Sequence, residues 1–131
     1  MMLIGDMIRR DARLYGGKTG LIEGDMHFTY TELNSRTNKL ANALIALGKI
    51  KEDKIAFMGN NSHQFVEFYF AAAKGGFVSI PVNSRFSADE AAYVLKDSEA
   101  TLLIYGEEME GTVQKIRELV PEIKQYVSTG N

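Results

Sequence analysis

The chain has 131 residues, of which 45% are hydrophobic, and this is enough to bury one core, so we expect a single domain over residues 1–131. Its 15 Lys and Arg residues are balanced by 17 Asp and Glu residues without a basic run, which argues against nucleic acid or a membrane surface as a partner. The chain has no Cys and two His residues, so a disulfide framework is excluded, a transition-metal site is disfavoured, and a cytoplasmic location fits. Because no apolar run approaches the roughly 20 residues that cross a bilayer, we expect no membrane span.

The first thirty residues predict an amphipathic helix followed by a small hairpin. Apolar side chains recur at helical spacing from Ile4 until the chain reaches two consecutive glycines at 16–17. Two β-rich stretches, residues 19–22 and 26–28, then flank a glycine-containing turn at residues 23–25. This pattern is typical of an antiparallel hairpin.

The next helix has clear start and end signals. The Thr29 hydroxyl and the Glu32 carboxylate can each accept a hydrogen bond from a free N–H group of a starting helix, and Gly48 is placed to end it. Its expected apolar face consists of Leu33, Thr37, Leu40, Leu44 and Leu47.

From residue 55 onward, short apolar stretches alternate with helical patterns. The expected strands are residues 55–58, 77–80, 101–105 and 124–127, and the expected helices are residues 62–74, 88–96 and 109–120. Asn61 with Gln64 and Ser87 with Glu90 have the spacing of capping boxes. Continuous apolar strands that alternate with helices predict an α/β fold, with a mostly parallel sheet and helices on both faces.

No group of residues in the chain has the pattern of a reactive centre, and we predict no catalytic, cofactor-binding or metal site. Gly17-Lys18-Thr19 resembles the end of a Walker A loop, but it follows a helix and enters a strand, which reverses the required order. Ser62 and His63 are adjacent and cannot face each other, and no partnering carboxylate is evident from the sequence. His27 is expected to be a half-exposed strand histidine.

Three other groups have a structural explanation that we favour over a functional one. Polar residues follow two predicted strands, at the edge where open α/β sheets bind ligands, but they also suit turns and caps: Asn60, Asn61, Asn83 and Arg85. The aromatic helix around residues 65–70 could line an acyl pocket, although core packing explains it better. Glu107, Glu108 and Glu110 begin the last helix, where negative charge is favourable.

Three blocks of the sequence resemble the adenylate-forming superfamily, which includes acyl-CoA synthetases, luciferases and peptide-synthetase adenylation domains. Residues 28–44 (FTYTELNSRTNKLANAL) are similar to its first core motif and residues 71–85 (AAAKGGFVSIPVNSR) to its second. Residues 95–104 (LKDSEATLLI) match the segment that follows. Asn83, followed by Arg85, is more similar to fatty-acyl-CoA synthetases than to peptide-synthetase domains, which usually have Asp there.

The resemblance implies that the chain is the N-terminal scaffold of an acyl-CoA synthetase. Such an enzyme joins a carboxylate to AMP from ATP with Mg²⁺, and then transfers the acyl group to CoA. The family's phosphate-binding loop ends in Pro-Lys-Gly, which residues 128–131 lack, and we expect that loop downstream of Asn131. We therefore expect the chain alone to be catalytically incompetent, with no cofactor of its own. Its partners should be the remainder of the parent synthetase or, when it is isolated, a second copy.

Two other interpretations remain open. The chain could be a non-catalytic α/β interaction or regulatory module such as a receiver domain, but receivers need acidic residues at strand ends, where this chain has Asn60 and Asn83. It could also be a fragment of a peptide-synthetase adenylation domain.

Overall fold

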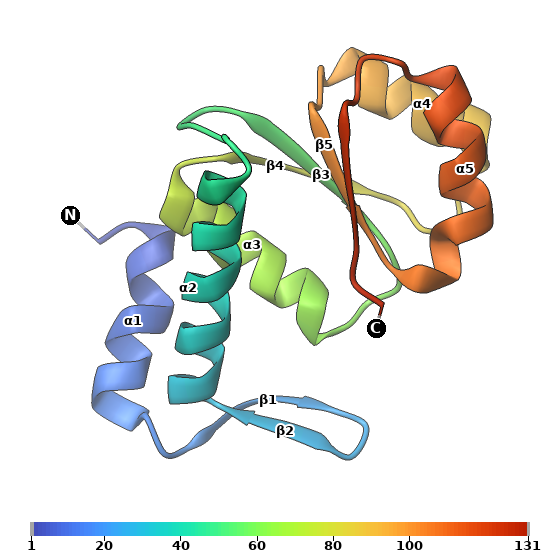
Figure 1. Cartoon of the computed structure of the whole chain (residues 1–131). Coiled ribbons are helices and arrows are strands. Elements are labelled where there is room, and N and C mark those ends of the chain that lie inside the picture. The colour runs from blue at the N-terminus through green and yellow to red at the C-terminus, as the bar shows by residue number, and fades with distance from the viewer. Residues whose placement is uncertain (1, 131) are drawn as a thin grey trace. The chain divides into compact units, whose positions relative to one another are not determined.

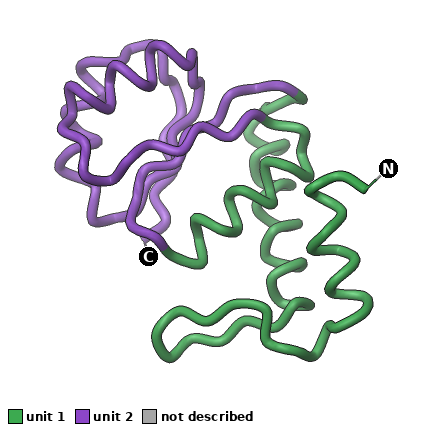
Figure 2. The backbone as a smooth tube through the Cα atoms, turned by 180° about the vertical axis from the view of Figure 1, so that it is seen from behind, with its two compact units in different colours: residues 1–51, 62–77 green, residues 52–61, 78–131 purple. Residues whose placement is uncertain are grey.

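The computed structural model describes residues 2–130, which divide into two units (Figure 2). The first contains the described residues up to 51 together with residues 62–77, and the second contains residues 52–61 and those from 78 onward. The chain therefore passes between the units three times. That residues 1–131 form one domain stays a prediction.

The first unit contains three helices and a hairpin (Figure 1). In chain order these are α1 (Ile4–Tyr15), β1 (Thr19–Glu23), β2 (Met26–Thr29), α2 (Tyr30–Ala46) and α3 (His63–Gly75). The two strands pair antiparallel, and the three helices pack against one another. The predicted N-terminal helix, hairpin and long helix are all confirmed.

Helix α2 begins with the predicted capping box. The Glu32 N–H donates to Thr29 Oγ1 at 3.1 Å, and the Thr29 N–H donates to Glu32 Oε1 at 3.4 Å. The expected apolar face is partly wrong, because Ala41 is buried while Leu47 is exposed. Leu47 follows the last helical residue, so it no longer continues the inward side of the helix.

Helix α3 starts one residue later than the predicted cap. Its N-cap is Ser62, whose Oγ accepts a hydrogen bond from the Phe65 N–H at 3.4 Å, and not Asn61. Both residue types can cap a helix, and the position of the first turn decides between them. The helix ends at Gly75, and Gly76 follows as its C-cap, with a left-handed φ of 73° that favours glycine.

The second unit is a four-stranded sheet with two helices (Figure 1). Its elements are β3 (Lys54–Met58), β4 (Val78–Val82), α4 (Ala88–Asp97), β5 (Leu102–Tyr105), a 3₁₀ turn η1 (Glu107–Met109), α5 (Glu110–Leu119) and β6 (Gln125–Ser128). All three strand pairs are parallel, and the strand order is β4-β3-β5-β6. The predicted α/β class with a mostly parallel sheet is confirmed.

The core of this unit lies between the sheet and the two helices. The buried side chains Ala91 and Leu95 of α4, and Val113 and Ile116 of α5, cluster with alternate residues of the central strands. The residues between them on β3 and β5 are also buried. Two-sided burial explains why these strands are continuous apolar runs. Among residues 2–130, no helix is both long and apolar enough to cross a membrane.

Candidate functional site

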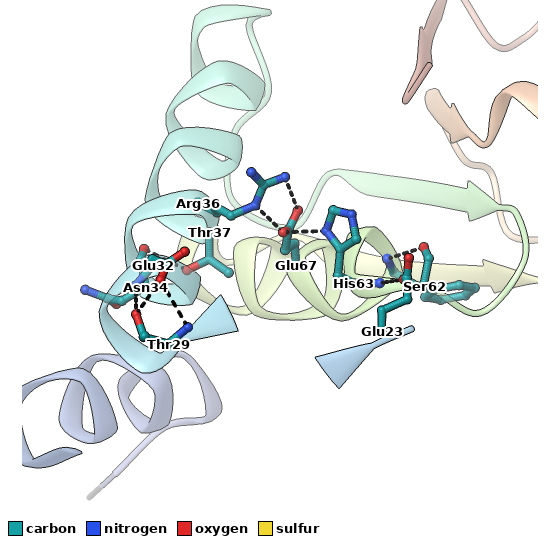
Figure 3. Close-up of polar contacts among 10 residues, drawn as sticks. Glu23, Thr29, Glu32, Asn34, Arg36, Thr37, Ser62, His63 and Glu67 are labelled. Atoms are coloured by element: carbon teal, nitrogen blue, oxygen red, sulfur yellow. Dashed lines mark hydrogen bonds and ion pairs between the residues drawn. The ribbon is translucent and has the colours of Figure 1, made fainter. Parts of the chain in front are cut away.

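Glu67, a buried charged residue of the first unit, lies in a four-residue cluster, which we call the Glu67 cluster (Figure 3). It consists of Glu23 from β1, Arg36 from α2, and His63 and Glu67 from α3. Three elements thus bring together side chains that are up to 44 positions apart in the sequence.

The Glu67 carboxylate is the centre of the cluster. The residue is 6% exposed, and an unpartnered carboxylate at such a position would be costly. Oε1 accepts short hydrogen bonds from Arg36 Nε and, at 2.9 Å, from His63 Nδ1. Arg36 Nη2 lies 3.5 Å from Oε2, so the guanidinium spans both carboxylate oxygens. The two partners offset the cost of burying the acid.

His63 connects the hairpin to the first turn of α3. Its backbone N–H donates to Glu23 Oε1 at 2.6 Å, which places a carboxylate at the positive end of the helix. Its ring lies 4.7 Å from that of Phe28, and Arg36 lies over the same Phe28 ring at 5.4 Å.

The prediction that His63 lacks a partnering carboxylate is wrong. Glu67 lies four residues further along the same helix, and i, i+4 spacing is a signal that could have revealed this pair from the sequence. Arg36 and Glu23 come from other elements, and no local pattern indicates their approach. Ser62, as expected, does not pair with His63, because its hydroxyl caps the helix.

The geometry of the Glu67 cluster is that of a structural interaction between elements. Arg36 already neutralises the carboxylate that bonds His63, and the Ser62 hydroxyl is used in the cap. Within the part of the chain that the structure describes, no group of three or more His, Cys, Asp or Glu side chains is placed to hold a metal ion. The arrangement fixes β1, α2 and α3 to one another.

Lys74 makes a second set of hydrogen bonds that connect α3 to α2. Its Nζ donates to Asn34 Oδ1 at 2.6 Å, Thr37 Oγ1 at 2.9 Å and Asn38 Oδ1 at 2.7 Å. Three short acceptors match the three N–H donors of an ammonium group. Burial, and secondarily the charge of Arg9, lower the pKa of Lys74 below its ordinary value.

The polar residues that follow strands β3 and β4 form hydrogen bonds within the loops. Asn83 Oδ1 accepts from the Arg85 N–H at 2.9 Å, and the Asn60 N–H donates to Glu108 Oε1 at 2.8 Å. Glu110 Oε2 accepts from the Tyr105 hydroxyl at 2.7 Å. The Asn83 side chain therefore has the turn role that the sequence favoured, Asn60 is bonded through its backbone, and carboxylates occupy this edge of the sheet.

The remaining sequence candidates are dispersed. Lys18 lies in the turn between α1 and β1, with Nζ 5.3 Å from the centre of the Tyr15 ring, and His27 is an exposed residue of β2. In the aromatic helix, Phe68 is fully buried whereas Tyr69 is exposed and stacks on Phe65 at 5.1 Å. Core packing therefore describes only one side of that helix.

Sequence comparisons find ligases that activate acids. The model of the AMP-binding enzyme family matches residues 8–130. Long-chain-fatty-acid–CoA ligase FadD13 of Mycobacterium tuberculosis is 34% identical over 119 residues, which are 89% of this chain and 24% of the relative. Crotonobetaine/carnitine–CoA ligase of Escherichia coli K12 is 35% identical over 112 residues, covering 82% of this chain and 22% of the relative. The chain thus spans about a quarter of the curated relatives it matches.

Structural comparison finds the same class of protein. The N-terminal domain of FACL13 from Mycobacterium tuberculosis superposes with a TM-score of 0.94 at 30% identity, over 98% of this chain and 34% of that one. Anthranilate CoA ligase AuaEII in complex with anthranoyl-AMP superposes with a TM-score of 0.93 at 25% identity, over 98% of this chain and 25% of that one.

Proposed function

Because this chain belongs to the AMP-binding enzyme family and corresponds to an N-terminal segment of an adenylate-forming acyl-CoA synthetase, we propose that it is scaffold in such an enzyme. The whole protein would join a carboxylic acid to AMP with ATP and Mg²⁺ and then transfer the acyl group to CoA. The match over residues 8–130, to relatives named as CoA ligases, carries this proposal. The need for ATP and CoA supports a cytoplasmic location.

The polar contacts of the first unit support a scaffold role. The acidic and basic residues of α3, Glu67 and Lys74, each form hydrogen bonds with several side chains of the same unit. A binding site keeps donors or acceptors available for its ligand, whereas these groups are used to hold helices and hairpin together. We infer that they position elements for chemistry performed by other parts of the enzyme.

The described residues do not fit a triphosphate. At the edge of the sheet where ligands of α/β proteins bind, the Asn60 N–H is taken by Glu108, and Glu107 and Glu110 add negative charge. Phosphate binding needs free N–H groups and cationic side chains. ATP and Mg²⁺ would therefore be held by other segments of the synthetase, and we assign no step of the reaction to this chain.

For the substrate, we propose a fatty acid with CoA as the acceptor. The two relatives above are both CoA ligases, and one is named for long-chain fatty acids. Asn83 and Arg85 agree with this subfamily. Another relative, ScoC of Streptomyces coeruleorubidus, is named as a fatty acid–acyl-carrier-protein ligase and is 37% identical over 94 residues. A carrier protein as acceptor is the competing outcome.

Exchange of pyrophosphate into ATP, dependent on an added fatty acid, tests the scaffold role of the isolated chain. We expect no exchange above a control without protein, because no group is available to stabilise charge on the phosphates in the transition state. An Arg85→Ala variant serves as the reference for the origin of any signal. Exchange that this substitution removes would show that the chain performs chemistry itself, and would overturn the proposal.

A further inference from the structure

Helix α1 carries a hollow that is lined mainly by arginine side chains, which we call the arginine hollow. It has a volume of about 390 Å³ and is lined by Met2, Asp6, Arg9, Arg10 and Arg13. Three basic side chains thus surround one acidic side chain. A hollow of this volume is large enough for a small molecule.

The three arginines differ in how far the chain itself neutralises their charge. Arg9 Nη2 donates to Asp6 Oδ1 at 2.7 Å, and Arg10 donates to Asp11 Oδ1 through Nε and Nη2 at 3.0 and 2.9 Å. Within the part of the chain that the structure describes, Arg13 makes no ion pair. Residues four apart share one side of a helix, so Arg9 and Arg13 offer their unused N–H donors to the same hollow.

A second hollow extends the positive charge toward α3. It has a volume of about 290 Å³, shares Asp6 and Arg9 with the arginine hollow, and is lined also by Lys74. Burial and, secondarily, the charge of Arg9 lower the pKa of Lys74, so the field of Arg9 reaches this lysine. The three short hydrogen bonds of Lys74 to α2 use its donors. Lys74 therefore contributes charge to the site rather than contacts.

The ion pairs already present indicate which anion suits the remaining donors. In both pairs of α1, one carboxylate is held by one guanidinium. A phosphate monoester has three terminal oxygens and roughly two negative charges at neutral pH, so it can accept hydrogen bonds from two guanidinium groups at once. A phosphate between Arg9 and Arg13 would use the donors that the carboxylates of the chain leave free.

The acidic residues of α1 favour a small ligand over a broad anionic surface. Asp6 lines the hollow, and Asp11 follows Arg10 directly in the helix. A membrane or another extended anionic surface that approached α1 would meet both carboxylates, whereas a single phosphate group can lie at the guanidinium of Arg13. The same two acids disfavour the higher charge of a triphosphate.

We propose that the arginine hollow binds a soluble phosphate monoester, with Arg13 and Arg9 as the residues that contact the phosphate. Lys74 adds positive charge from α3. The proposal goes beyond the scaffold role, does not depend on the reaction of the parent enzyme, and assigns no step of that reaction to the chain. The sequence predicted no binding site here, because the spacing of these arginines matches no phosphate-binding motif.

An NMR titration of the complete chain with glycerol 3-phosphate tests the site without involving adenine recognition. The amide signals of α1 should shift and saturate with a dissociation constant of about 1 mM or tighter. Glycerol, which lacks the phosphate, should cause no such shifts, and excess inorganic phosphate should reverse those caused by glycerol 3-phosphate. Absence of saturable binding, or binding that inorganic phosphate does not displace, would overturn the proposal.

Two variants that each remove one positive charge show whether the arginine hollow is responsible. Arg13→Gln should weaken the binding of glycerol 3-phosphate at least about tenfold. Lys115→Gln, at an exposed position of α5, is the matched control and should bind like wild type. Thermal melts establish that both variants are folded. Equal weakening by the two substitutions would indicate nonspecific attraction and contradict the site.

Sedimentation with lipid vesicles distinguishes a soluble phosphate from a phosphate of a lipid headgroup. Vesicles of phosphatidylcholine with phosphatidic acid should leave the chain in the supernatant. A chain that sediments with these vesicles, and shows no saturable binding of glycerol 3-phosphate, would have a membrane surface as its ligand and would refute the proposal.

Discussion

Glu67 shows how a single buried side chain organises the first unit. Its carboxylate accepts hydrogen bonds from Arg36 of α2 and His63 of α3, and His63 in turn is held by Glu23 of the hairpin. Only the His63–Glu67 contact is local in sequence, so only that contact could have been predicted from the sequence. Arg36 lies 31 positions away, and its approach depends on the packing of two helices.

Replacing Glu67 by Ala should lower the free energy of unfolding by about 1–3 kcal/mol. The loss is below that of a fully buried pair because the Arg36 side chain is 44% exposed and can return to water. Glu118→Ala, on the exposed side of α5, is the control and should change stability by less than about 0.5 kcal/mol. Urea denaturation measures both. Equal effects of the two substitutions would show that the Glu67 cluster does not contribute to the free energy of unfolding.

Tyr105 makes stability depend on alkaline pH. Its hydrogen bond to Glu110, and secondarily its burial, raise the pKa of Tyr105 above its ordinary value of 10.0. The folded state therefore keeps the phenolic proton to higher pH than the unfolded state, and the stability it contributes below pH 10 is lost as the pH rises through the folded pKa.

Tyr105→Phe should reduce this loss. Lys74 and Tyr126 titrate in both proteins, so the difference between wild type and variant isolates Tyr105. The free energy of unfolding of wild type should fall more steeply than that of Tyr105→Phe between about pH 9 and pH 11. Chemical denaturation at several pH values measures the two slopes. Parallel slopes would contradict the raised pKa.

At the scale of elements, local signals predicted most boundaries and missed those that depend on tertiary context. The capping boxes at Thr29 and Ser87 start α2 and α4 as predicted, because both partners lie within one turn. The N-cap of α3 is Ser62 and not the predicted Asn61, because either side chain can cap a helix. The alternation of strands and helices along the sequence predicted parallel strand pairing. The strand order could not be read from the sequence, because it depends on how the crossovers pack.

The cap of α4 provides a test at this scale. Ser87→Ala removes the acceptor for the Glu90 N–H, which lies 3.2 Å from Ser87 Oγ, and should lower the free energy of unfolding by about 1 kcal/mol. The same substitution at Ser35, an exposed position inside α2, should be neutral or slightly stabilising because Ala has the higher helix propensity. A thermal melt of each variant compares them. If Ser35→Ala costs as much as Ser87→Ala, the cap is not the cause.

At the scale of the whole molecule, the chain belongs to the AMP-binding enzyme family and spans about a quarter of the length of the two ligases compared above. Its resemblance to that family was evident from three sequence blocks, and the family match over residues 8–130 agrees with them. The buried ties at Glu67 and Lys74 were not predicted, because they join helices that are distant in sequence. Together these features support the proposal that the chain is scaffold, with polar groups that serve its own fold.

Transplantation tests this account most directly. A chimera in which this chain replaces the matching segment of FadD13 should fold, as judged by a cooperative thermal melt, and should ligate long-chain fatty acids to CoA within about tenfold of the FadD13 rate. The isolated chain, assayed beside it, should be inactive. A chimera that melts cooperatively but has lost ligase activity by several orders of magnitude would contradict the account, because the segment would then carry more than scaffold.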